Sequence, residues 1–99
     1  MPSTRDETGT TVLDLDCARY KSASMNHAPQ GAHFRCSCGP LTESDLARLE
    51  HAVRSNGRIR LLFVGGHVLL SDVEVERIEA SWVRVTGRVV HAALPAQPF

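Results

Sequence analysis

Two cysteines and a histidine lie close together near the middle of the chain, in the run HFRCSCG over residues 33–39. Thiolate and imidazole groups are ligands that suit zinc. A tetrahedral zinc site needs a fourth ligand, which Cys17 or His27 upstream could supply. His33, Cys36 and Cys38 are therefore candidate metal ligands.

The spacing of these cysteines leaves other roles open. A single residue separates Cys36 from Cys38, whereas structural zinc sites usually place two to four residues between paired cysteines. No second cysteine pair follows, and an odd total of three cannot all pair as internal disulfides. The alternatives are incidental thiols in a loop and a redox or nucleophilic cysteine. We expect no cofactor, with zinc as the alternative.

The sequence lacks the motifs of an enzyme. No nucleophile, base and orienting acid stand at a spacing that a catalytic motif uses, and Gly65-Gly66 lacks the lysine and helix that follow a phosphate-binding loop. We therefore predict that the protein is not an enzyme.

Charge is balanced overall but sorted along the chain. Lysine plus arginine number 11 and aspartate plus glutamate also 11, which argues against a protein that coats nucleic acid. Arginines cluster near residues 54–60 and acids over residues 72–79. Such sorting predicts either cross-strand ion pairs between Arg58 or Arg60 and these acids or a dipolar docking surface. The candidate binding residues are Arg58, Arg60, His67, Trp82 and Arg84.

One short helix is predicted after Leu41 to position the middle of the chain. Thr42 can cap it, Asp45 stands at the third helical position, and Leu41 and Leu46 occupy the staple positions. Apolar residues at helical spacing form one stripe, and Asn56-Gly57 supplies a left-handed stop.

After Gly57 the apolar period changes to the alternation of strands. Residues 59–63 and 68–75 alternate on either side of a turn at Gly65-Gly66, which predicts a hairpin. Residues 81–86 alternate again, and Gly87 is expected to break that strand before a last strand begins at Val89. We predict a mainly β fold with one helix: an N-terminal helix followed by a small antiparallel SH3-like barrel of four or five strands.

The chain is predicted to divide at about residue 40. Residues 1–40 are rich in small and polar types, which indicates a largely flexible leader, and residues 41–99 would form the helix and barrel. No apolar stretch approaches the roughly 20 residues that span a bilayer, and the first 25 residues lack the apolar core of a secretion signal. We expect a cytoplasmic protein with no membrane partner.

The stretch 45–87 resembles two families of small barrels. The segment Arg60–Gly66 after a helix resembles the bacterial Sm-like RNA chaperones, and the helix at 46–53, the strand at 58–63 and the strand at 82–85 are similar to the WYL domain. Both families have SH3-type barrels. The resemblance implies a module that binds single-stranded nucleic acid or another protein through strand edges and loops, and assembly into a homo-oligomer by edge-strand pairing.

Three functional hypotheses follow from these observations. The leading one is a non-enzymatic binding module, a regulator or inhibitor that docks on a larger protein by its barrel edge and dipolar surface. The second is a regulator that binds single-stranded RNA or DNA through Arg58, Arg60, Trp82 and Arg84. The third is a zinc- or thiol-dependent protein.

Overall fold

The computed structural model describes residues 3–5 and 11–93. In chain order the elements are β1 (Ser3–Arg5), β2 (Thr11–Asp16), β3 (Tyr20–Ala28), β4 (Gly31–Cys38), α1 (Glu43–Arg54), β5 (Arg58–Phe63), β6 (Gly66–Glu79) and β7 (Trp82–Ala93). The strands form one seven-stranded sheet in the order β1-β2-β5-β6-β7-β4-β3. Strand β2 runs parallel to β5, and the other neighbours are antiparallel.

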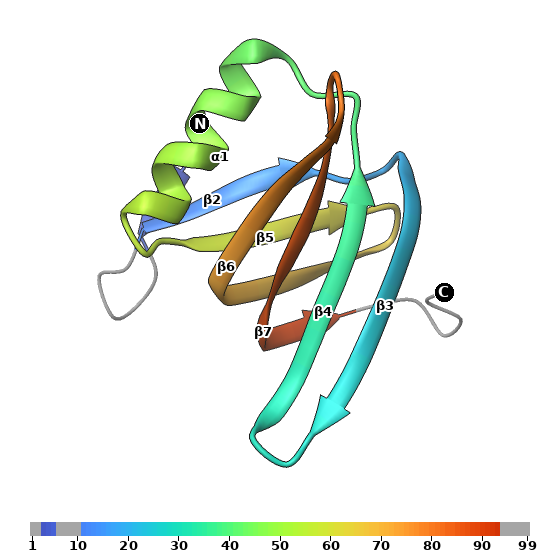
Figure 1. Cartoon of the computed structure of the whole chain (residues 1–99). Helices are drawn as coiled ribbons and strands as arrows, with labels where there is room; N and C mark the ends of the chain where they lie inside the picture. The colour runs from blue at the N-terminus through green and yellow to red at the C-terminus, as the bar shows by residue number, and fades with distance from the viewer. Residues whose placement is uncertain (1–2, 6–10, 94–99) are drawn as a thin grey trace.

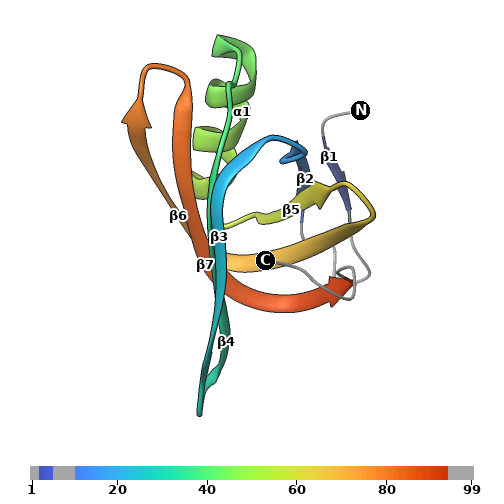
Figure 2. The same cartoon turned by 90° about the vertical axis from the view of Figure 1, so that its right-hand side faces the viewer.

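The predicted barrel with an N-terminal helix is wrong. The described chain is mainly β with one helix, but α1 follows β4, and the sheet has seven strands rather than four or five. The sheet is mixed and strongly coiled, and its end strands β1 and β3 do not pair with each other, so it does not close (Figures 1 and 2). Strand β2 pairs with β5 at one side of the sheet, and the β3–β4 hairpin pairs with β7 at the other, so β1 and β3 stand at opposite ends.

Strands also occupy most of the range in which the sequence predicted a leader. Strands β2, β3 and β4 cover much of residues 11–38 and belong to the same sheet as the strands after α1. In β4, Phe34 and Cys36 are buried while the residues between and before them, Arg35 and His33, are exposed. This alternation is that of a half-buried strand. Residues 1–2 and 6–10 of the predicted leader lie outside the described residues.

Helix α1 packs across the sheet and closes one side of the core. Its buried residues Leu46, Leu49 and Ala52 contact a cluster that includes Ile59 and Leu61 of β5. Figure 1 shows the helix over β2, β5 and β6, while the β3–β4 hairpin extends to the opposite end of the molecule. Among the described residues, no helix has the length and apolar character needed to cross a bilayer.

The predicted helix signals are confirmed. The Thr42 hydroxyl accepts a hydrogen bond from the Asp45 backbone N–H at 3.1 Å, and Leu41 and Leu46 are both buried. Asn56 has a φ of 55°, the left-handed conformation that ends the helix.

The β5–β6 hairpin forms as predicted, but its turn lies one residue earlier than expected. The strand break predicted at Gly87 is wrong. Phe63 pairs with Gly66, so the two-residue turn is Val64-Gly65. Gly87 does not break a strand, because β7 runs through it. A Cβ at Gly87 would lie 3.0 Å from both the Leu70 Cβ and the Ser71 carbonyl oxygen. The glycine is therefore a point of close approach between β6 and β7.

Candidate functional site

Three cysteines from two separate segments meet in the core. The Sγ atoms of Cys17, Cys36 and Cys38 all lie within 4.8 Å of one another, and none of the three residues is exposed to solvent. All three are free thiols. All three lie in the apolar core, and Cys36 and Cys38 belong to a strand, not to the loop that the sequence suggested for incidental thiols.

The sheet brings these cysteines together. Cys36 and Cys38 are alternate residues of β4, so their side chains share its inner face, opposite Val85 and Val83 of β7. Cys17 directly follows β2, and its backbone N–H donates to the Leu62 carbonyl oxygen at 2.7 Å. This bond fixes the chain where it leaves β2 and turns toward β3.

The structure does not bring His33 to the cysteines. His33 is exposed. Side chains alternate between the two faces of β4, and Phe34, Cys36 and Cys38 are buried on the face opposite to His33. The upstream residue that joins Cys36 and Cys38 is Cys17. His27, the other upstream histidine, is exposed and lies opposite Ala32 near the hairpin turn.

The thiols perturb one another. Cys17 and then Cys36 hydrogen-bond to the Cys38 sulfur, and these bonds to the thiolate hold the pKa of Cys38 well below its ordinary value. The pKa of Cys17 is raised by its hydrogen bonds with Cys36 and then with Cys38, and by burial.

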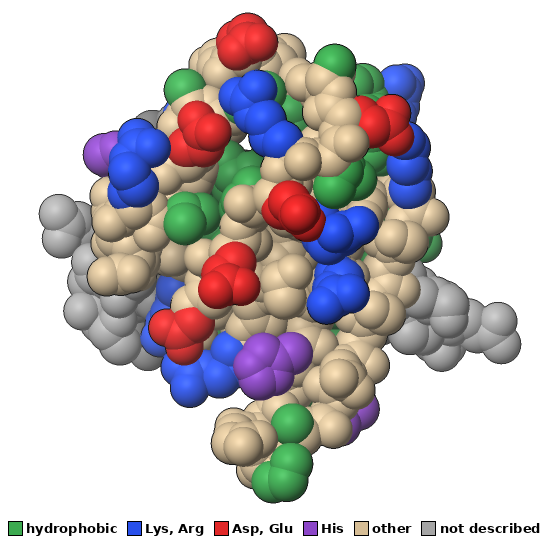
Figure 3. Space-filling model, viewed as in Figure 1, with side chains coloured by type: hydrophobic (Ala, Val, Ile, Leu, Met, Phe, Trp, Pro, Cys, Tyr) green, Lys and Arg blue, Asp and Glu red, His purple; other side chains and the backbone are tan. Residues whose placement is uncertain are grey.

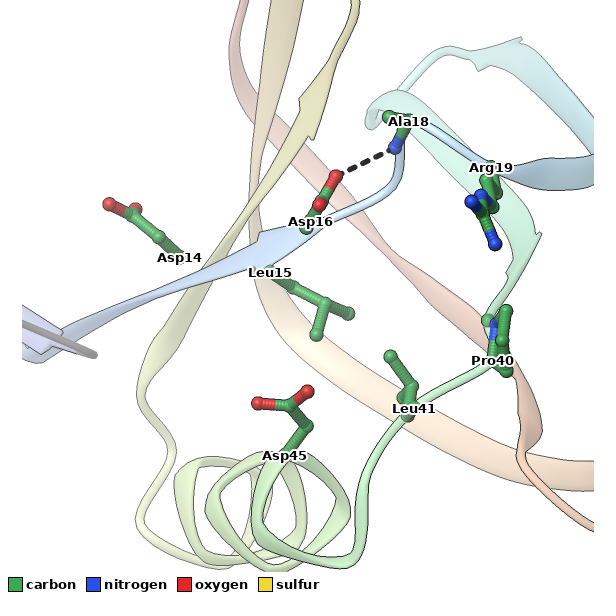
Figure 4. Close-up of a pocket in the computed structure, with 9 residues that line it drawn as sticks. Asp14, Leu15, Asp16, Ala18, Arg19, Pro40, Leu41 and Asp45 are labelled. Atoms are coloured by element: carbon green, nitrogen blue, oxygen red, sulfur yellow. Dashed lines mark hydrogen bonds between the residues drawn. The ribbon is translucent and has the colours of Figure 1, made fainter.

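A pocket of about 410 Å³ is formed by residues of β2, of the turn after it and of the segment that leads into α1 (Figure 4). Its lining includes Asp16, Ala18 and Gly39, which are the immediate chain neighbours of Cys17 and Cys38. The Asp16 carboxylate accepts a hydrogen bond from the Ala18 N–H at 2.9 Å. The Asp16 charge also raises the pKa of Cys38, which agrees with a carboxylate close to that sulfur.

Two other carboxylates line the pocket and are paired with arginines. Asp14 forms an ion pair with Arg60, and Asp45 forms one with Arg48. Figure 4 shows the Asp45 carboxylate pointing from the start of α1 toward Leu15 of β2. Charge in the pocket is thus partly compensated.

The predicted binding residues do not form one platform. Arg60 lies opposite Leu69, which lies opposite His91 of β7. Arg84 precedes His91 by seven residues on that strand, which is about 23 Å of extended chain. The arginines of β5 are therefore separated from Trp82 and Arg84 both by strand β6 and along the strand direction.

Trp82 is held by its neighbours. The Lys21 ammonium lies 4.5 Å from the centre of its ring, a cation–π contact. Next to the ring lies Gly39, where an added Cβ would approach Trp82 Cδ2 to 2.8 Å. The tryptophan is half-buried, and its ring joins β7 to the end of β4 and to β3.

His67 forms a pair with another histidine. Its Nε2 lies 3.3 Å from His91 Nδ1, and the two rings stack with centres 5.3 Å apart. The pair is at the turn end of β6, where His67 is a diagonal neighbour of Arg60 across the β5–β6 register, and it lies away from Trp82 and Arg84.

The acidic residues of β6 pair mainly with β7 rather than with β5. Glu76 pairs with Arg84 at 2.7 Å, and Asp72 with Arg88 at 3.0 Å. Arg60 instead pairs with Asp14 of β2, because β2 lies directly beside β5. Figure 3 shows the result on one face of the molecule, where acidic and basic side chains are interspersed.

The second candidate site is the outer edge of β3. This nine-residue strand ends the sheet and pairs with β4 alone among the described strands. A hollow of about 260 Å³ lies on the sheet face that β3 shares with β4 and β7, lined in part by Ser24, Asn26, Arg35 and Thr86. A second hollow of about 480 Å³ shares Arg35 and Thr86 and continues toward β6.

Comparisons of the chain with protein-family models, curated proteins and solved structures give no match. The candidate sites therefore rest on their own geometry.

The sequence alone did not predict the edge strand β3. It indicated Cys17 only as an alternative to His27 for the fourth metal ligand. The signal for this strand was its alternation, in which Ala23 and Met25 are half-buried between the exposed Ser22, Ser24 and Asn26. For Cys17 there was no local signal, because its position beside Cys36 depends on where β2 pairs.

Proposed function

We propose that this chain is a non-enzymatic binding module that takes up an extended segment of another protein along the free edge of β3. The observation that carries the proposal is the position of β3 at the end of the sheet, where Ser22–Ala28 pair with β4 and with no other described strand. An unpaired edge presents a row of backbone N–H and C=O groups that an incoming strand can use.

The edge has few of the features that usually prevent strand addition. From Ser22 to Ala28 the strand contains no proline, and its register with β4 is regular. Lys21, its one charged residue at neutral pH, forms an ion pair with Glu79 and covers Trp82. This lysine is thus engaged with β6 and β7, which supports a role for the rest of the edge as a binding surface.

The hollow beside β3 would give the interaction specificity. In strand addition the backbone bonds supply affinity, and alternate side chains of the added segment are distinguished by pockets. Ser24, Asn26 and Arg35 offer hydroxyl, amide and guanidinium groups there. A partner segment with a polar or acidic side chain at the matching position suits this lining.

We favour a protein partner over a nucleic acid because the arginines that would bind phosphates are already paired with carboxylates. Arg60 and Arg84, which would contact phosphates, are each in an ion pair with a carboxylate. Binding a phosphate there would require breaking those pairs. The proposed setting is the cytoplasm, where three free thiols would stay reduced.

The test uses peptides selected from a random library on the immobilised full-length chain. Binding of each peptide to the isotope-labelled chain is followed by NMR of the backbone amides. We expect the largest shift changes in Tyr20–Ala28, together with slower hydrogen exchange of the amides in that strand. Changes centred on Arg58 and Arg60 or on Trp82 and Arg84 would contradict the proposal, as would selection of no peptide.

A matched pair of variants tests the hollow. Ser24→Arg fills it and places a positive charge beside Arg35, whereas Ser44→Arg makes the same change at an exposed position of α1. We expect Ser24→Arg to weaken peptide binding at least tenfold and Ser44→Arg to leave it unchanged. Equal affinity of the two variants would remove the hollow from the proposal.

A further inference from the structure

We propose that Cys17, Cys36 and Cys38 form a three-sulfur site for one soft metal ion of low coordination number, Cu(I). This site is separate from the β3 edge, and the inference does not rest on the proposed binding function. It differs from the ligand set predicted from sequence, because Cys17 takes the place of His33.

The positions of the sulfurs fit a trigonal site. A metal ion bonded to three thiolates at about 2.3 Å requires sulfurs roughly 4 Å apart. The three Sγ atoms already lie within 4.8 Å of one another. Small side-chain rotations would therefore suffice, with no movement of the backbone.

The backbone around the sulfurs is rigid enough to keep this arrangement. Cys36 and Cys38 lie on a strand that is paired on both sides, with β3 and with β7. Cys17 is fixed by its bond to the Leu62 carbonyl oxygen. A site built on paired strands positions its ligands better than one built on loops.

The ligand set favours Cu(I) over zinc. No histidine, aspartate or glutamate of the described residues joins the three cysteines within the same distance of one another. Structural zinc sites are nearly always four-coordinate, whereas Cu(I) is stable with two or three sulfur ligands and is selected by soft thiolates. The surroundings are apolar, with Val83 and Val85 fully buried against β4. A dry pocket of three sulfurs therefore suits a soft ion that needs no water ligand.

The pocket of about 410 Å³ adjoins the segments that carry Cys17 and Cys38, but none of the three cysteines lines it. Asp16 and Gly39 line it, and each is bonded in the chain to a cysteine of the cluster. Each Cu–S bond to a thiolate forms as that sulfur releases its proton to solvent, and copper stays as Cu(I), so no oxidant or reductant is consumed.

The test is an oxygen-free titration of the reduced full-length chain with Cu(I), in competition with a coloured Cu(I) chelator. We expect one Cu(I) per chain and a rise in Tm with added Cu(I), because an ion that binds only the folded state stabilises it. X-ray absorption of the complex should show sulfur neighbours only, at about 2.3 Å.

Two single variants test whether Cys17 or His33 is the third ligand beside Cys36 and Cys38. Cys17→Ser should weaken Cu(I) binding at least tenfold, and His33→Ala should bind like the wild type. Circular dichroism of Cys17→Ser reports whether it folds. If it does not, the absorption spectrum of the wild-type complex decides, because nitrogen ligands there would contradict the proposal.

Other outcomes would overturn the inference directly. Failure of the folded, reduced wild type to bind Cu(I) would end it. Unchanged affinity in folded Cys17→Ser would remove this cysteine from the site. Retention of one zinc ion per chain in the presence of competing Cu(I) would contradict the low coordination number.

Discussion

Arg60 of β5 and Asp14 of β2 join the two parallel strands of the sheet through a two-point contact. The Arg60 Nε lies 2.8 Å from Asp14 Oδ1, and Nη2 lies 3.1 Å from Oδ2. The two residues are 46 positions apart in sequence and are direct neighbours in the strand register. Hydrogen bonding to Asp14 raises the pKa of Arg60 further above its ordinary value. The contact ties the first described strands to the hairpin that follows α1.

Removal of this contact should weaken the joint between β2 and β5. Both side chains are about one-third exposed, so solvent screens the pair, and we expect a coupling free energy of about 1 kcal/mol. The measurement is a double-mutant cycle of Arg60→Ala and Asp14→Ala by urea denaturation. A coupling of zero would mean that the pair does not contribute to the free energy of unfolding.

Gly39→Ala should destabilise the protein. An added Cβ would lie 2.7 Å from the Ser81 carbonyl oxygen and 2.8 Å from Trp82 Cδ2, and the first of these is backbone that cannot rotate away. We expect the free energy of unfolding to fall by about 1–3 kcal/mol, as for other overpacked sites. Thermal unfolding followed by tryptophan fluorescence measures the change. An unaltered Tm would show that the β6–β7 turn can move to accept a methyl group.

Thr42→Ala should remove the cap of α1. The Thr42 hydroxyl accepts from the Asp45 N–H, and without it that donor loses its partner within the chain. We expect a loss of about 1 kcal/mol in the free energy of unfolding. Thr42→Ser keeps the hydroxyl and is the matched control, so its stability should be close to that of the wild type. Equal losses in both variants would point to the missing methyl group instead.

Asp45→Asn should alter stability in a pH-dependent way. The Arg48 guanidinium, followed by hydrogen bonds with Thr42, holds the pKa of Asp45 below its ordinary value of 3.8. Because the folded pKa is the lower one, the carboxylate stabilises the fold above pH 3.8, and this contribution is lost as the pH falls through the folded pKa. The pair is exposed, so we expect Asn to cost about 0.5 kcal/mol at neutral pH.

The measurement for Asp45 is urea denaturation of the wild type and the variant at neutral and at acid pH. Their difference in free energy of unfolding should shrink on acidification, since the protonated carboxyl no longer attracts Arg48. A difference that is the same at both pH values would show that charge on Asp45 is not its source.

Local sequence signals predicted the helix and the first hairpin after residue 41, but not the unbroken strand β7. The cap at Thr42, the left-handed Asn56 and the β5–β6 hairpin all involve contacts within a few residues, and the structure has each of them. The strands β3 and β4 were harder to predict. Their exposed positions carry small polar residues that also suit a flexible segment, and only packing of Phe34 and Cys36 into the core distinguishes the two.

The sequence by itself determined that the chain holds one capped helix, a tight hairpin and balanced charge, because each depends on residue types that act locally. Only the tertiary structure decided that β2 pairs with β5, that the sheet stays open at β3, and that Cys17 joins Cys36 and Cys38. Strand partners are chosen by the burial of apolar faces across the whole chain, so no short window of sequence contains that information.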